Sequence, residues 1–244
     1  MTQKCILNER KKDGCQACTG VCSHRIALMG LSGTGGRVGS ANIPKGYRDI
    51  TLKTSPAREE QAKVYAHLER YVATFERQFD EDDERIKSLY LYSQAPGTGK
   101  TTSASALANE YLIAHYIGSL KRGRQPKQTP VFFLDINELQ TKYNLATMTS
   151  DESELNEVKA TAKRSATVDF LICDDIGIRG ATESFRAIVH SIINARTTTD
   201  LPTVYTSNVP ITELKTVFDE RLADRIGDMC LNLAFTGESK RGKR

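Results

Sequence analysis

Long apolar runs are missing from this chain of 244 residues, and their absence excludes a large class of proteins. A helix that crosses a membrane needs about 20 consecutive apolar residues, and no run in the sequence approaches that length. The first residues also lack the apolar core of a signal peptide. We therefore expect a cytoplasmic protein with no membrane partner.

A large excess of charge of one sign is lacking as well. The formal net charge is +4, which is too small to predict a nucleic-acid partner by itself. Basic side chains nevertheless gather within residues 1–50, 121–127 and 240–244. Such runs are more often solvated surface than binding sites, so DNA contact is the alternative interpretation for each of them. The length suits one sizeable α/β core with a small appendage.

A short glycine-containing turn predicts a phosphate-binding loop. Residues 93–102 read SQAPGTGKTT, follow the apolar run 89–92 and precede an amphipathic helical pattern. Gln94 stands where the usual motif has glycine. The glycines let backbone N–H groups face a polyphosphate, Lys100 would reach its β- and γ-phosphates, and the Thr101 hydroxyl would bind Mg²⁺. The predicted nucleotide-binding residues are Pro96, Gly97, Thr98, Gly99, Lys100, Thr101 and Thr102.

Polar side chains follow two further predicted strands. The nearly continuous apolar run 168–173 ends in Asp174 and Asp175, and such runs are typical of strands covered on both faces of a parallel sheet. We expect Asp174 to bind Mg²⁺ and Asp175 to orient and deprotonate the attacking water, the alternative being a solvated acidic turn. The run 203–206 leads to Asn208, which would sense the γ-phosphate or, alternatively, only form the turn before Pro210.

Apolar segments of two kinds alternate along the chain and predict an α/β fold. Strands are expected at about 88–92, 130–135, 168–174, 203–207 and 230–235. Helices are expected at about 56–79, 100–120, 136–146, 152–165, 182–197 and 211–226. Strands that alternate with helices form a parallel sheet covered on both faces, so we predict three layers around a five-stranded parallel sheet.

Four of the six cysteines lie near the N-terminus, at Cys5, Cys15, Cys18 and Cys22. The C-x₂-C pair is a common half of a tetrahedral Zn²⁺ site, and so short a segment cannot build a hydrophobic core of its own. We predict zinc bound by these four cysteines, with His24 as the alternative to Cys5. An iron–sulfur cluster and unmetallated thiols are the competing interpretations.

In order along the chain, PGTGKT at 96–101, LICDDIG at 171–177 and TSN at 206–208 resemble the Walker A, Walker B and sensor 1 motifs of AAA+ ATPases. The segments IPKGYR at 43–48, IINAR at 192–196, LPT at 201–203 and RLADRI at 221–226 are similar to those of the DnaC/DnaI-type helicase loaders of bacteria and phages. The resemblance implies that the second arginine of RLADRI, Arg225, completes the active site of a neighbouring subunit. It covers about residues 43–235.

The same resemblance implies a function. It indicates an ATP-dependent loader that places a replicative hexameric helicase on single-stranded DNA and hydrolyses ATP at the interfaces of a homo-oligomer. The catalytic residues would be Lys100, Asp175, Asn208 and Arg225. Lys142 and Tyr143 would contact single-stranded DNA, and the alternative is an ordinary amphipathic helix there. The competing functions are an IstB-like transposition ATPase on duplex DNA and a zinc-dependent DNA-binding adaptor with a nucleotide switch.

The expected domain order is a cysteine-rich zinc head at 1–28, a flexible glycine-rich linker at 29–42, an AAA+ ATPase domain at 43–235 and a basic tail at 236–244. One strand and the tail follow residue 226, which leaves no room for the helical lid of most AAA+ proteins. We therefore expect a lidless ATPase domain.

Overall fold

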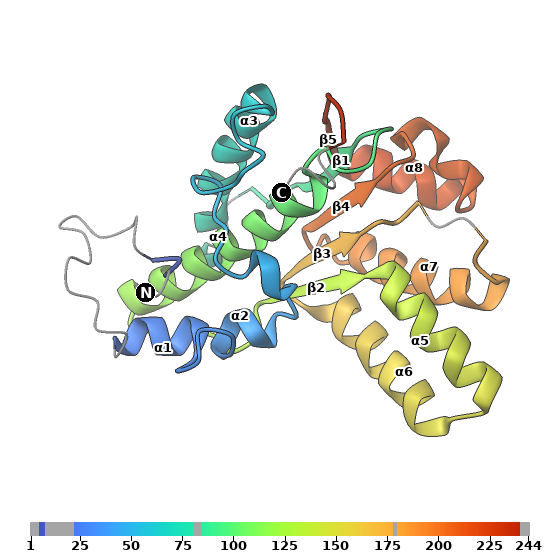
Figure 1. Ribbon diagram of the computed structural model, residues 1–244, viewed down its shortest axis with the longest axis horizontal. Helices are drawn as coiled ribbons and strands as arrows, with labels where there is room; N and C mark the ends of the chain where they lie inside the picture. Colours follow the sequence, from blue (N-terminus) through green and yellow to red (C-terminus); the bar gives the residue numbers. More distant parts are fainter. Residues whose placement is uncertain (1–4, 8–21, 81–83, 178–179, 240–244) are drawn as a thin grey trace.

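The computed structural model describes residues 5–7, 22–80, 84–177 and 180–239. One parallel sheet runs through the molecule, with its strands in the order β2–β3–β4–β1–β5 (Figure 1). All five predicted strands and their parallel pairing are confirmed. The strands are β1 (Ser88–Tyr92), β2 (Val131–Asp135), β3 (Phe170–Asp174), β4 (Thr203–Ser207) and β5 (Cys230–Ala234).

Helices cover both faces of the sheet. Successive strand residues point to opposite faces, so Phe133 packs in one core cluster and Phe132 in the other. The first face carries α4 (Lys100–Lys121), with α1 (Ser23–Met29), α2 (Gly36–Ser40) and α3 (Ala62–Ala73) grouped around α4. The second face carries α5 (Ile136–Thr149), α6 (Glu152–Thr167), α7 (Glu183–Thr198) and α8 (Glu220–Met229). The predicted three layers are confirmed.

Helix α4 is buried along most of its length because it has the sheet on one side and other helices on the other. Tyr111 of α4 stacks on Phe170 of β3, with ring centroids 4.5 Å apart, and the edge of Phe75 meets both rings. Burial of an aromatic side chain such as Phe170 contributes roughly 1.5–3 kcal/mol to folding. This packing fixes α4 against the sheet, and the predicted phosphate-binding loop leads into the N-terminus of that helix.

Two predicted helices have different limits in the structure. The pattern at 56–79 becomes α3 followed by the 3₁₀ helix η3 (Thr74–Phe79), and the pattern at 211–226 becomes η4 (Ile211–Thr216) and a separate α8. Helix α8 begins after Asp219, whose carboxylate accepts a hydrogen bond of 3.0 Å from the N–H of Leu222. Asp219 is thus an N-cap that starts a new helix within the apolar pattern.

The glycine-rich segment is not an extended linker in the structure. It contains α2, in which Val38 is fully buried. Gly36 has φ of 58°, and a Cβ atom there would lie 2.7 Å from the backbone of Leu28, so glycine permits the close approach of α1 and α2. Arg37 donates hydrogen bonds of 2.8–2.9 Å to the carbonyls of Ala27, Pro126 and Lys127. The glycine content suggested a flexible linker, and these long-range contacts could not be read from the composition.

Within the described parts of the chain, no helix is long and apolar enough to cross a membrane.

Candidate nucleotide-binding site

A cavity of about 830 Å³ opens at the carboxyl edge of the sheet. In a parallel sheet all strands end at the same edge, so side chains that follow different strands meet there. The loop after β1 and the ends of β2, β3 and β4 supply most of the lining. The residues from these elements are Pro96, Gly97, Thr98, Gly99, Lys100, Thr101, Thr102, Asp135, Asn137, Asp174, Asp175, Thr206 and Asn208.

The loop after β1 has the backbone of a phosphate-binding turn. Gly97 and Gly99 have φ angles of 73° and 100°, which side chains larger than hydrogen rarely allow. A Cβ atom on Gly99 would lie 2.6 Å from the Cβ of Ala57. Gln94 is exposed and is not among the positive-φ residues, so the turn does not require glycine at that position. The departure from the usual motif therefore leaves the loop intact.

The hydroxyl of Thr98 also points to a ligand in this cavity. Thr98 is buried and lines the cavity, yet its Oγ1 has no hydrogen-bond partner within the described chain. A buried hydroxyl without a partner costs free energy, and a phosphate oxygen would accept its proton. The loop thus has both the backbone shape and a spare side-chain donor for a polyphosphate.

Lys100 meets Asn208 inside the cavity, although 108 positions separate the two residues. The ammonium Nζ donates hydrogen bonds to Asn208 Oδ1 at 2.7 Å and to the carbonyls of Ser93 and Ala95 at 3.3 Å. The lysine lies at the N-terminus of α4, where the helix dipole favours an anion. A phosphate bound here would contact both the Lys100 ammonium group and the Asn208 amide.

Thr101 and Asp174, the two predicted Mg²⁺ ligands, lie in contact. The Thr101 hydroxyl lies 3.1 and 3.2 Å from the two carboxylate oxygens of Asp174. Burial raises the pKa of Asp174 to about 6, against hydrogen bonds from Thr206 and Thr101 that lower it. A bound cation would favour the charged carboxylate. Oxygen donors from a hydroxyl and a carboxylate are those that Mg²⁺ prefers, so these residues fit the ion.

Asp175 lies in the left-handed backbone region, with φ of 62°, which is uncommon for residues other than glycine and which aspartate tolerates better than most. Its Oδ2 accepts a hydrogen bond of 2.8 Å from the amide of Asn137, which lies in the first turn of α5. Asn137 was not among the site residues predicted from the sequence. Its signal was available, because Asn137 follows the predicted strand 130–135 just as the acidic pair follows the next strand.

The wall opposite the strand ends comes from the segment before α3, which was not predicted to line the site. Pro44, Tyr47, Pro56 and Ala57 line the cavity there. Gln61 is 4% exposed, and its amide nitrogen donates to the carbonyl of Thr98 at 3.3 Å and to that of Thr236 at 2.6 Å. Apart from Glu60, the side chains of this wall are apolar or aromatic and suit a flat base. The contacts of Gln61 connect this segment to the loop before α4.

Arg225 lies apart from this cavity. It lines a separate hollow of about 490 Å³ between α7 and α8, where its Nη1 donates a hydrogen bond of 2.6 Å to Asn194 Oδ1. Asp219 pairs with His190 at 2.8 Å in the same hollow. The hydrogen bond from Leu222 N–H and the neighbouring His190 lower the pKa of Asp219. Arg225 therefore does not join Lys100 and Asp175 within one chain.

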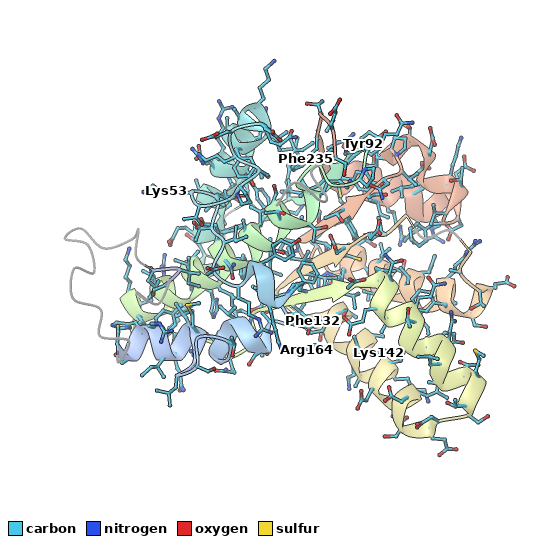
Figure 2. The ribbon with its side chains drawn as sticks, in the orientation of Figure 1. Lys53, Tyr92, Phe132, Lys142, Arg164 and Phe235 are labelled. Atoms are coloured by element: carbon cyan, nitrogen blue, oxygen red, sulfur yellow. The ribbon has the colours of Figure 1, made fainter. Side chains whose placement is uncertain are left out.

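The residues predicted to contact DNA have contacts within the chain. Lys142 forms an exposed ion pair with Glu138 at 3.1 Å. Tyr143 is half-buried, and its ring lies 5.7 Å from that of Phe185, which favours the packing alternative for this tyrosine. Figure 2 labels Lys142 beside α5. The DNA contact stays a prediction.

The cysteine cluster is described only in part. Cys15 and Cys18 lie outside the described residues, and Cys5 and Cys22 are partly buried. The Nδ1 of His24 lies 2.9 Å from the hydroxyl of Tyr116, so one of the two ring nitrogens is engaged. No group of three potential metal ligands occurs in the described ranges. The zinc site stays a prediction.

The strand order and the helices on both faces of the sheet are those of the AAA+ α/β fold. Its backbone matches the crystal structure of the DnaC helicase loader with a TM-score of 0.55 and 20% identity, over 79% of this chain and 100% of that one. No protein-family model matches the chain.

The sequence itself is distantly similar to the replicative helicase loader DnaC. Identity to the Escherichia coli (strain K12) protein is 27% over 150 residues, which are 62% of this chain and 54% of the relative. Identity to the DnaC of Buchnera aphidicola subsp. Schizaphis graminum is 28% over 190 residues, or 78% and 68% of the two chains. The chain matches about half the length of the E. coli relative. The predicted resemblance to DnaC-type loaders is confirmed.

Proposed function

We propose that this chain is an ATP-dependent loader that places a replicative hexameric helicase on single-stranded DNA. The observation that carries the proposal is the meeting of Lys100, Asp174 and Asn208 in one cavity of an AAA+ fold whose sequence relatives are named as replicative helicase loaders. ATP is the nucleotide implied by that fold. It would place its phosphates on the loop after β1 and its base against Tyr47, Pro56 and Ala57.

Different residues of the chain have different roles in ATP hydrolysis. Lys100 and the loop N–H groups hold the phosphates, and Thr101 and Asp174 would hold Mg²⁺. The ion would neutralise charge on the β- and γ-phosphate oxygens. Asp175 orients the attacking water and takes its proton, while Asn208 contacts the γ-phosphate. Positioning and charge stabilisation contribute most of the catalysis in phosphoryl transfer.

Arg225 would act on ATP bound to a second copy of the chain. Its exclusion from the cavity of its own chain supports this assignment, because an arginine that acts in trans must lie on an outer surface. Its acceptor, the Asn194 amide, is neutral and leaves the guanidinium charge in place. Homo-oligomers with ATP at their interfaces are therefore part of the proposal.

A helicase capture and loading experiment tests the proposed function. The full-length protein, with ATP, is mixed with a hexameric replicative helicase and circular single-stranded DNA, and helicase retained on the DNA is measured. We expect helicase to be retained on the DNA with the wild-type chain and not in a reaction without it. No capture of the helicase by the full-length chain would contradict the loader function.

The IstB-like alternative remains a distinct outcome of a DNA-binding measurement. A loader should bind single-stranded DNA better than duplex when ATP is present, with affinity falling as salt rises. Tighter binding to duplex would favour the transposition ATPase. Replacement of Tyr143 by alanine would show whether that residue stacks on a base or only packs on Phe185.

We also propose that the N-terminal head binds one zinc ion through Cys5, Cys15, Cys18 and Cys22. The support is the spacing of these cysteines in the sequence. Elemental analysis of protein purified without added metal should give about one zinc per chain. If the protein contains iron, the cysteines hold an iron–sulfur cluster. If it contains no metal, the cysteines are unmetallated thiols.

A further inference from the structure

We infer that Thr206 is a positioning residue that fixes both carboxylates of the proposed ATPase site. The inference rests on the proposed hydrolytic function of that site. Thr206 lies on β4, which runs between β3 and β1 in the sheet, and is 2% exposed. Its side chain is therefore largely shielded from bulk water.

One hydroxyl makes two contacts of different kinds. Thr206 Oγ1 donates its proton to Asp174 Oδ1 at 2.6 Å and accepts the backbone N–H of Asp175 at 2.9 Å. A hydroxyl has one proton and two lone pairs, so both contacts form together. The first contact orients the proposed metal ligand, and the second fixes the backbone of the residue that faces the water.

The second contact matters because Asp175 lies in the left-handed region, with φ of 62°. A residue other than glycine is strained there and keeps that conformation only where its surroundings impose it. Regular pairing between β3 and β4 extends to Cys173 opposite Tyr205. Beyond that pair, Ile176 N–H donates to the Thr206 carbonyl at 3.0 Å. Thr206 thus holds the chain on both sides of Asp175 where β3 leaves the sheet.

The end of β4 also positions Asn208, the third polar group of the site. Two residues after Thr206, Asn208 accepts the hydrogen bond from Lys100. A single strand therefore couples the metal ligand, the water-activating carboxylate and the phosphate contacts. Loss of the hydroxyl should disturb the carboxylates and leave the phosphate loop, which α4 holds, in place.

Thr206→Val tests the inference, because valine keeps the shape of the side chain and removes both contacts. We expect kcat for ATP hydrolysis to fall roughly 10–100-fold, the effect of losing a hydrogen bond to a charged group, with KM changed by less than about 3-fold. The affinity for Mn²⁺ in the presence of ADP, measured by electron paramagnetic resonance, should fall about 10-fold. Thr206→Ser should restore both values.

Thr203→Val is the matched control. Thr203 lies on the same strand, is 1% exposed and accepts a hydrogen bond of 2.7 Å from Arg196. We expect its replacement to lower thermal stability and leave Mn²⁺ affinity unchanged. Unaltered kcat and Mn²⁺ affinity in Thr206→Val, or equal losses in Thr206→Ser and Thr206→Val, would overturn the inference. Failure of both Thr206→Val and Thr206→Ala to fold would also overturn it, since Thr206 would then be a residue of the fold.

The Mn²⁺ measurement separates this inference from the proposed function. A wild-type chain that binds Mn²⁺ with ADP but hydrolyses no ATP would contradict the ATPase assignment. The affinity difference between Thr206→Val and Thr206→Ser would still decide the role of the hydroxyl.

Discussion

The nucleotide cavity and the hollow between α7 and α8 hold the two predicted parts of one reaction, and they are built in opposite ways. In the cavity, functional side chains from different strands already contact one another, as Lys100 contacts Asn208 and Asp175 contacts Asn137. In the hollow, Arg225 donates a hydrogen bond to the neutral Asn194 amide and lies on the side of α8.

This difference shows which part of the chemistry one chain can organise. A sheet brings strand ends together in its interior, so the cavity has buried groups with defined partners. Residues on the outer surface of a helix face outward, where a second protein chain can contact them. We therefore expect substitutions in the cavity to act on each subunit alone, and substitutions in the hollow to act only in assemblies.

Asp175→Asn should have the largest effect. Removal of the base should lower kcat by about 10²–10⁴-fold, while ATP affinity stays within about 3-fold, because the Lys100 loop is untouched. Phosphate release and titration with a fluorescent nucleotide measure the two quantities. Hydrolysis at the wild-type rate would show that Asp175 is not the base.

Asp174→Asn should stabilise the protein in the absence of metal and nucleotide. Burial raises the pKa of Asp174 from 3.8 to about 6, so the folded chain holds this proton more tightly than the unfolded chain. The free energy of unfolding therefore falls as pH rises from about 4 to about 6 and stays lowered above that. At pH 7 the asparagine variant should gain up to about 3 kcal/mol.

Urea unfolding with a metal chelator measures this gain at pH 7 and at pH 4. The difference between variant and wild type should shrink to about 0.5 kcal/mol at the lower pH, where the carboxyl is protonated in the folded chain and about half protonated in the unfolded chain. The same variant should lose Mg²⁺-dependent hydrolysis. An equal or lower stability at pH 7 would contradict the burial of an unfavourable charge at this position.

Lys100→Ala should lower ATP affinity by roughly 10–100-fold, because it removes a charged donor from the phosphate site. Nucleotide titration measures the change. Lys53→Ala is the control, since Lys53 is an exposed lysine outside the cavity lining (Figure 2). A comparable loss in both variants would show that general charge, and not the loop geometry, determines affinity.

Asn194→Asp should have the smallest effect and should appear only in assemblies. A carboxylate in place of the amide would pair with Arg225 and cancel its charge, which should lower assembly-dependent ATPase activity about 2–5-fold. Asn194→Ala, which leaves the arginine charge intact, is the control. A stronger loss in the alanine variant would mean that Asn194 orients Arg225 and that the charge matters less.

The sequence was sufficient to predict elements whose signals are local. The apolar runs before 93–102 and before Asp174 predicted β1 and β3, and the glycines and Lys100 predicted the phosphate loop that follows. Residue type and spacing determine these features, so no tertiary information was needed.

Other parts of the site depend on which strands become neighbours. The contacts of Asn137 and Thr206 with the acidic pair follow from the order β2–β3–β4–β1–β5, which no local pattern specifies. The packing of α2 depends likewise on Arg37 reaching carbonyls at 126 and 127, far along the chain. Non-local contacts of this kind cannot be derived from periodicity.

The division of one ATPase site between two copies is tested most directly by mixing two inactive variants. Arg225→Ala subunits keep an intact cavity, and Asp175→Asn subunits keep an intact arginine surface, so some interfaces of a mixed assembly combine both intact parts. Each variant alone should be nearly inactive, and the mixture should recover a measurable part of the wild-type ATPase rate. No recovery in assemblies shown to contain both variants would contradict the trans role of Arg225.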